Sequence, residues 1–286
     1  MNIHSNIRRG CALGALLAAM AAALPASAAP FFFSSGTPDG LMASATRPGA
    51  GGKIEIEAAD NFILPSETRI NTAIFTGLLT GGASAANIGQ VVAEIYRVFP
   101  KDSTNPPSGR VPTRVNSPSD VAFDSRDSAG GGLTFNITTL GTFTAANSVL
   151  NGINPIPNQT TGGDGAVTGT EVTITVNFGT PFDLPADHYF FVPQVEVTGG
   201  EFYWLSAPRP ITGGSGPFAP DLQSWIRNEP LAPDWLRVGT DIVGAGTFNN
   251  SFALIGEVPE PGSIALLLAG VLPLALVRRR RAAAQA

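Results

Sequence analysis

A general base for hydrolysis would have to be His188, since the only other histidine, His4, lies near the start of the chain. A Ser-His-Asp site also needs a positioned nucleophile, and the sequence contains no Gly-x-Ser-x-Gly motif that could supply one. We therefore interpret His188 as an ordinary histidine of a turn or strand.

Two carboxylates with a defined spacing are Glu55 and Glu57. On one face of a strand they would lie roughly 7 Å apart, a separation that glycoside hydrolysis can use. Lys53 shares this face, and Ile54 and Ile56 alternate with it. This amphipathic pattern favours the solvated side of an edge strand over a catalytic pair.

Metal ligands are sparse, because Cys11 is the only cysteine in the chain. A zinc site is therefore not expected. Residues 124–127 and 162–165 offer carboxylates in loops, but neither stretch has the Asp-x-Asp-x-Asp-Gly spacing of a calcium loop. We predict no cofactor, and the sequence leaves calcium binding open.

The tryptophans are all in the last third of the chain: Trp204, Trp225 and Trp235. Exposed indole rings could stack on sugars and form a carbohydrate site. The alternative is that these large rings fill the core, and we favour it because large aromatic side chains are highly buried on average.

Period-two alternation of apolar and polar residues dominates the region that must position these groups. In residues 133–140, for example, Leu133, Phe135 and Ile137 alternate with threonine and asparagine. Gly and Pro punctuate the segments, which indicates an all-β fold, a two-sheet β-sandwich of the jelly-roll type. The expected strands are 53–58, 70–79, 90–99, 133–140, 171–178, 188–192, 201–205 and 251–255.

Two long polar stretches, residues 100–120 and 151–169, interrupt the strand pattern. They are too rich in turn-forming residues to be strands. Loops of this length in a compact domain are either functional or decorative, and the sequence does not decide between these roles.

Residues 1–28 have the layout of a secretory signal peptide. Arg8 and Arg9 precede the apolar stretch 11–24, and Ala26 and Ala28 complete an A-x-A cleavage site. The apolar stretch is too short to span a bilayer. We predict an N-terminal signal helix, cleavage by signal peptidase and export.

The C-terminal region also combines an apolar segment with arginines. As a helix, residues 264–277 would span about 21 Å, against a hydrocarbon core of about 30 Å. Arg278, Arg279, Arg280 and Arg281 fit the positive-inside rule, with residues 282–286 as a cytoplasmic tail. We expect a short transmembrane helix that anchors the chain before processing.

The sequence Val-Pro-Glu-Pro-Gly-Ser, with Pro259, Glu260 and Pro261 at its centre, precedes this apolar segment and its arginines. In this order the tail, residues 257–281, resembles a PEP-CTERM sorting signal. The resemblance implies a Gram-negative cell, in which the chain is exported across the inner membrane. It also implies an exosortase that recognises Pro259, Glu260 and Pro261, removes the hydrophobic tail and sends the product to the cell surface or extracellular matrix.

A second resemblance concerns residues 58–65, Ala-Ala-Asp-Asn-Phe-Ile-Leu-Pro, which precede a long predicted strand. They are similar to the opening of bacterial extracellular jelly-roll domains that carry this C-terminal signal. This similarity favours a jelly roll over an immunoglobulin-like topology for the predicted domain, residues 29–256.

Charge limits the partners of this domain. Residues 29–257 carry 11 Lys and Arg against 21 Asp and Glu, a net charge of −10, so nucleic acid is not an expected partner. We expect a non-enzymatic, secreted structural or adhesive protein of the cell surface or the biofilm matrix. The alternatives are a carbohydrate-binding module for exopolysaccharide and, less favoured, an extracellular glycoside hydrolase.

Overall fold

The computed structural model describes residues 28–105, 107–153, 156, 159–208, 222–244 and 246–259. The predicted signal peptide, including Ala26, lies outside this part except for Ala28. So do the predicted hydrophobic helix and the sorting residues Glu260, Pro261 and Arg278 to Arg281. Within the described part, no helix has the length and apolar character needed to cross a bilayer.

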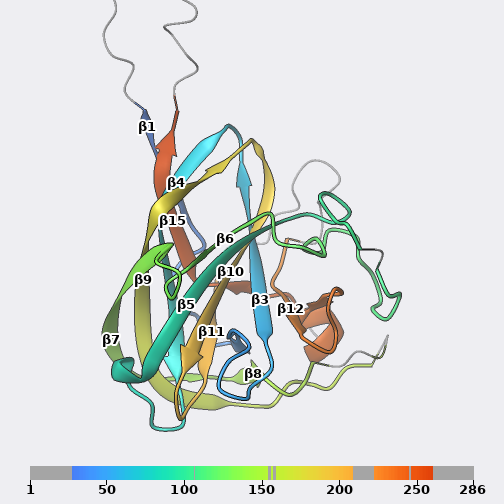
Figure 1. The fold of residues 1–286 in the computed structure, drawn as a ribbon. Helices are drawn as coiled ribbons and strands as arrows, with labels where there is room; N and C mark the ends of the chain where they lie inside the picture. The colour runs from blue at the N-terminus through green and yellow to red at the C-terminus, as the bar shows by residue number, and fades with distance from the viewer. Residues whose placement is uncertain are drawn as a thin grey trace, which may run out of the picture. The chain divides into compact units, whose positions relative to one another are not determined.

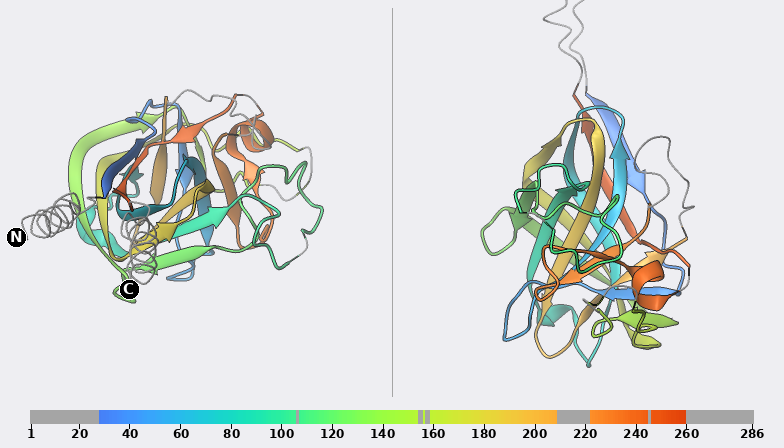
Figure 2. Two further views of the ribbon diagram at one scale, coloured as in Figure 1. Left: turned by 90° about the horizontal axis from the view of Figure 1, so that it is seen from above. Right: turned by 90° about the vertical axis from the view of Figure 1, so that its right-hand side faces the viewer.

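The described strands form two sheets (Figure 1, with two further views in Figure 2). The nine-stranded sheet contains β1 (Ala29–Ser34), β2 (Met42–Ala45), β4 (Thr68–Leu79), β7 (Leu133–Ala145), β8 (Asn147–Val149), β9 (Val167–Leu184), β11 (Phe202–Ala207), β14 (Asn249–Asn250) and β15 (Phe252–Val258). The six-stranded sheet contains β3 (Ile56–Leu64), β5 (Ile88–Arg97), β6 (Asp124–Asp127), β10 (Asp187–Val197), β12 (Trp225–Asn228) and β13 (Leu236–Arg237). The helical turns are η1 (Ala85–Asn87) and η2 (Val238–Val243).

Two strands organise the sheets. In the larger sheet, β4 pairs antiparallel with β9 on one side and with β15 and β11 on the other. In the smaller sheet, β10 lies between β3 and β5, again antiparallel. The prediction of an all-β protein with two sheets is confirmed.

The main core lies between the sheets and follows the predicted alternation. On β9, Val172, Ile174 and Val176 are fully buried, while Thr173 and Thr175 between them are partly exposed. β10 differs, because nearly all of its residues are buried. Its outer face packs in a second cluster, which contains Ala59, Tyr96, Val98, Phe190, Val192, Trp225 and Trp235.

The predicted strands all occur, but two details are wrong. The strand expected at 53–58 begins only at Ile56, and as β3 it lies between β12 and β10 and not at an edge. The polar stretch 151–169 is not wholly loop, since β9 already begins at Val167. Both errors arise because strand pairing extends or shortens a segment beyond its local pattern.

The first and last strands are neighbours in the larger sheet (Figure 1). After them, Ser35 continues the contact: its backbone N–H donates to the Phe252 carbonyl at 2.9 Å, and its hydroxyl donates to the Asn250 carbonyl at 2.5 Å. The two ends of the folded body therefore lie side by side.

Candidate functional site

The ionisable groups that are most deeply buried together are Glu57 and Arg227. They are direct partners in the β3–β12 ladder, are 3% and 7% exposed, and form an ion pair through Arg227 Nε. This corrects the expectation of a solvated glutamate on an edge strand: the face of the sheet that carries Glu57 is covered. A carboxylate in such a place needs a cation, and Arg227 supplies it.

Tyr96 completes a closed network with this pair. Its hydroxyl donates to Glu57 Oε1 at 2.6 Å and accepts from Arg227 Nη2 at 2.8 Å. Arg227 Nη1 also donates to the carbonyls of Asp120 and Pro233, at 3.2 and 3.3 Å. Burial, and next the charge of Glu57, raise the pKa of the Tyr96 hydroxyl well above its ordinary value.

Glu94 lies two residues before Tyr96 on β5 and faces the same carboxylate. Burial raises its pKa to about 8, and repulsion by Glu57 and a hydrogen bond with Glu57 add to the effect. Glu94 therefore keeps its proton at neutral pH. The pKa of Glu55 is also raised, first by burial and then by Glu57, although Gln194 donates a hydrogen bond to it at 3.0 Å.

A protonated carboxyl beside a carboxylate is an arrangement that can exchange protons. Glycoside hydrolysis requires the two carboxyl groups to be at least about 5 Å apart, so that the glycosidic bond fits between them. Here the Tyr96 hydroxyl instead occupies the space between them, 2.6 Å from Glu57 Oε1 and 3.4 Å from Glu94 Oε2. Glu57 is also neutralised by Arg227, so this cluster, Glu55–Glu57–Glu94–Tyr96–Arg227, is built to hold the covered face together.

Aromatic rings close the cluster. The guanidinium of Arg227 lies 4.2 Å from the Trp235 ring centroid, and Trp235 meets Tyr96 edge-on at 5.3 Å. Trp235 Nε1 donates to the Ser119 carbonyl at 3.3 Å. These contacts desolvate the ion pair and fix its geometry.

The tryptophans do not form a carbohydrate site. Trp204 and Trp225 are fully buried and Trp235 is 1% exposed. Trp204 packs edge-on against Phe191 and Phe252 in the main core. A sugar cannot reach an indole face that is already covered, so the sugar-stacking interpretation is wrong and the core interpretation holds for these three residues.

The stretch 100–120 helps to cover the outer face of the six-stranded sheet. Its main anchor is Arg114, whose Nε donates to Asp234 Oδ1 at 2.7 Å. Burial alone would raise the pKa of Asp234, but hydrogen bonds from Arg114 and Ser108 outweigh it and hold the pKa below its ordinary value. The carbonyls of Ser119 and Asp120 in this stretch also accept hydrogen bonds from Trp235 and Arg227, so this part of the stretch has a structural role.

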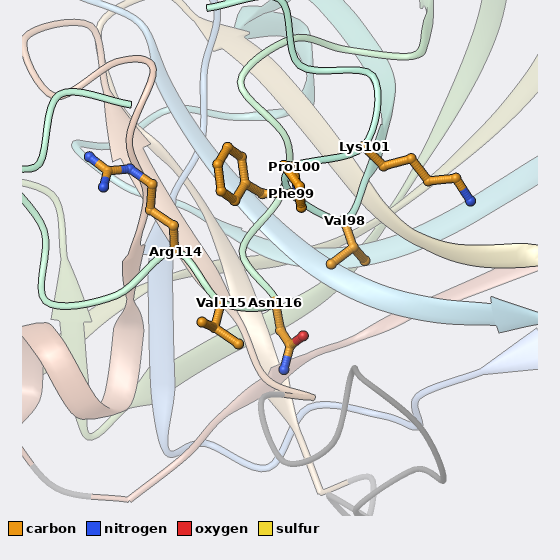
Figure 3. Close-up of a pocket in the computed structure, with 7 residues that line it drawn as sticks. All are labelled: Val98, Phe99, Pro100, Lys101, Arg114, Val115 and Asn116. Carbon is orange, nitrogen blue, oxygen red and sulfur yellow. The ribbon is translucent and has the colours of Figure 1, made fainter. Parts of the chain in front are cut away.

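A surface pocket of about 490 Å³ lies in the same region, lined by Val98, Phe99, Pro100, Lys101, Arg114, Val115 and Asn116. Figure 3 shows the side chains of Lys101 and Arg114 pointing in opposite directions. Each is already paired, Lys101 with Asp187 and Arg114 with Asp234. The lining brings no carboxylate, histidine or hydroxyl nucleophile into the pocket.

The other candidates serve local structure. His188 is 2% exposed and stacks on Phe190 at 5.5 Å. Asp164 accepts hydrogen bonds from the backbone N–H groups of Leu150 and Asn151, at 2.6 and 2.9 Å. Among the residues that the structure describes, no group of three or more His, Cys, Asp or Glu side chains could hold a metal ion.

Sequence reasoning missed Glu94, Tyr96 and Arg227. Glu94 and Tyr96 alternate along the predicted strand 90–99, so they share a face, but nothing in the sequence shows that this face is covered. Arg227 comes from a segment more than a hundred residues away. A comparison of the chain with protein-family models gives no match, and a comparison with curated proteins gives none either.

Proposed function

We propose that this is an exported, exosortase-sorted structural or adhesive protein of the cell surface or the biofilm and exopolysaccharide matrix, with no catalytic activity. Signal peptidase and exosortase process it in turn. The C-terminal segment holds it in the inner membrane before the second cut. A PEP-CTERM signal of residues 257–281 directs this sorting.

The main support is the place of the folded body between the two predicted signals. β1 begins at Ala29, directly after the predicted cleavage at Ala28, and β15 ends at Val258, directly before Pro259. Because β1 and β15 are neighbours, both predicted cuts fall at the same end of the sandwich (Figure 1). Cuts after Ala28 and at or after Pro259 would leave every described strand of the body intact.

A second support is that the polar chemistry of the body is used internally. The Glu57–Arg227 pair and Tyr96 satisfy one another beneath aromatic rings, and the lining of the described pocket contains no carboxylate, histidine or hydroxyl group. We also propose that the sandwich is a jelly roll, because successive long strands alternate between the sheets: β3 to β4 to β5, and β9 to β10 to β11. These features suit a stable, non-catalytic module.

The test is to express the native gene in strains with and without exosortase and to determine the mature C-terminus by intact mass. We expect a cut near Pro259, with the product on the surface or in the medium only when exosortase is present. The variant Glu260→Ala should block the cut. Glu257→Ala, three residues upstream and partly exposed, is the matched control and should be processed normally.

An uncut chain that stays in the inner membrane of both strains would contradict the proposal and make the tail an ordinary anchor. Hydrolysis of exopolysaccharide by the purified product would contradict its non-catalytic part. Tight polysaccharide binding by a monomeric product would instead favour the carbohydrate-binding alternative.

A further inference from the structure

β7 is an edge of the nine-stranded sheet. It pairs with β9 from Leu133 opposite Phe178 to Ala145 opposite Val167, and no other described strand pairs with it. In Figure 1 it lies outside β9, at the left of the view. Along an antiparallel edge, alternate residues point both their N–H and C=O groups away from the sheet, where another strand can pair with them.

The other described edges carry features that discourage such pairing. β6 contains three charged residues, Asp124, Arg126 and Asp127, and β1 contains Pro30. β8 is three residues long, and β13 and β14 are two residues long each. Charge, proline and short length are the usual means by which proteins protect sheet edges.

β7 has none of these protections. It is 13 residues long, and its sequence LTFNITTLGTFTA contains no charged residue and no proline. Its one irregularity is a register shift between Thr139 and Gly141, and this leaves residues 133–139 as a regular segment. A long, neutral and unprotected edge is a template for a further strand.

We infer that β7 pairs antiparallel with β7 of a second copy of this chain and joins two nine-stranded sheets into one. The pairing is self-complementary, as a two-fold interface requires. Thr134, Asn136 and Thr138 project from the exposed face and would meet threonine and asparagine of the partner, pairs that hydrogen-bond across strands.

Charge distribution favours this contact over others between two copies. The region 29–257 has a net charge of −10, so most orientations of two copies bring like charges together. β7 has no charged residue along its whole length, so pairing of two β7 strands brings no like charges together within the strands. The inference rests on the proposed function only for its purpose, since a dimer closed by the two-fold pairing would present two copies of the body to the matrix.

Cysteine cross-linking tests the pairing directly. In the full chain carrying Cys11→Ser, the variants Thr134→Cys, Asn136→Cys and Thr138→Cys each place one thiol along the β7 edge. We expect a disulfide-linked dimer whose yield peaks at the position nearest the two-fold axis. Thr175→Cys is the matched control: it lies opposite Asn136 on β9, one strand further in, and should not cross-link.

Sedimentation velocity gives a second measurement. Thr138→Lys places like charges across the proposed interface and should weaken self-association on the order of tenfold. Thr175→Lys, on the same face of β9, should leave it unchanged. Thermal unfolding of each variant shows that the fold is retained.

Three results would overturn the pairing. They are a protein that stays monomeric at every concentration with no cross-link, equal weakening by both lysine variants, and association that requires added polysaccharide. The exosortase experiment is separate. A chain that is sorted but monomeric refutes only this pairing, and a chain that dimerises through β7 but is never cut refutes only the sorting.

Discussion

At the scale of single residues, the covered face of the six-stranded sheet depends on how its carboxyl groups are charged. Arg227 neutralises Glu57, and Glu94 avoids a second buried charge by keeping its proton. Removing one partner of a buried pair leaves an uncompensated charge, so a single substitution in such a network strongly destabilises the fold.

Glu94 should make the stability of the protein depend on pH. Its pKa is about 8 in the folded protein, against an ordinary value of 4.5, so the folded state binds more protons between these values. Stability is therefore greatest at the acidic end of this range and falls as pH rises through about 8. We expect the melting temperature of the wild type to fall between about pH 5 and pH 8, and that of Glu94→Gln to fall much less.

Glu229→Gln provides the control, because Glu229 is exposed on the neighbouring turn. Its melting curve should follow that of the wild type at each pH. If the melting temperatures of the wild type and Glu94→Gln fell equally with rising pH, ionisation of Glu94 would not be the cause of the pH dependence.

At the scale of elements, the larger sheet depends on a close approach between β4 and β11. Gly77 lies opposite Trp204 in their ladder. A Cβ at this position would overlap the Phe202 ring and the Tyr203 carbonyl oxygen. Only glycine lets the two strands pack at this distance.

Gly77→Ala should therefore lower the free energy of unfolding by about 3 kcal/mol, as overpacked cores do. Gly179→Ala in β9 is the control, since the nearest atom to its Cβ would be the Gly132 carbonyl oxygen at 3.5 Å. Urea denaturation of both variants measures the difference. A Gly77→Ala protein as stable as Gly179→Ala would mean that β11 can shift away from β4 at little cost.

At the scale of the whole molecule, the first and last described strands, β1 and β15, close the sandwich together. Phe33 on β1 packs against Phe252 on β15 at 5.1 Å and against Phe62 on β3 at 6.2 Å. The same strand turns Phe32 outward, 69% exposed. The N-terminal strand thus belongs to the core, although it directly follows the predicted signal.

Phe33→Ala should lower the free energy of unfolding by about 2 kcal/mol, because a partly buried ring loses less than the 3–5 kcal/mol of a fully buried one. Phe32→Ala, on the neighbouring residue, should change it by less than about 0.5 kcal/mol. Denaturant titration of both variants decides this. Equal losses would place both rings in comparable surroundings and contradict the packing of β1.

The sequence by itself determined the all-β class, because the alternation of Val172, Ile174 and Val176 with threonine is a local property that needs no partner. Short segments without clear alternation, such as β2, β8 and β12, were missed, because they are strands only through their neighbours. The sequence also predicts two terminal signals, and these stay predictions.

Only the tertiary structure decided what the polar and aromatic residues do. Beside Lys53 the sequence predicts a solvated Glu57. It is buried because Arg227 of the neighbouring strand β12 pairs with it and the stretch 100–120 packs against that arginine. For Trp225 and Trp235 the sequence favoured the core and left a sugar platform as the alternative, and only burial decided between them. Burial depends on which segments pack over a strand, and those segments come from distant parts of the chain, so no local pattern carries this information.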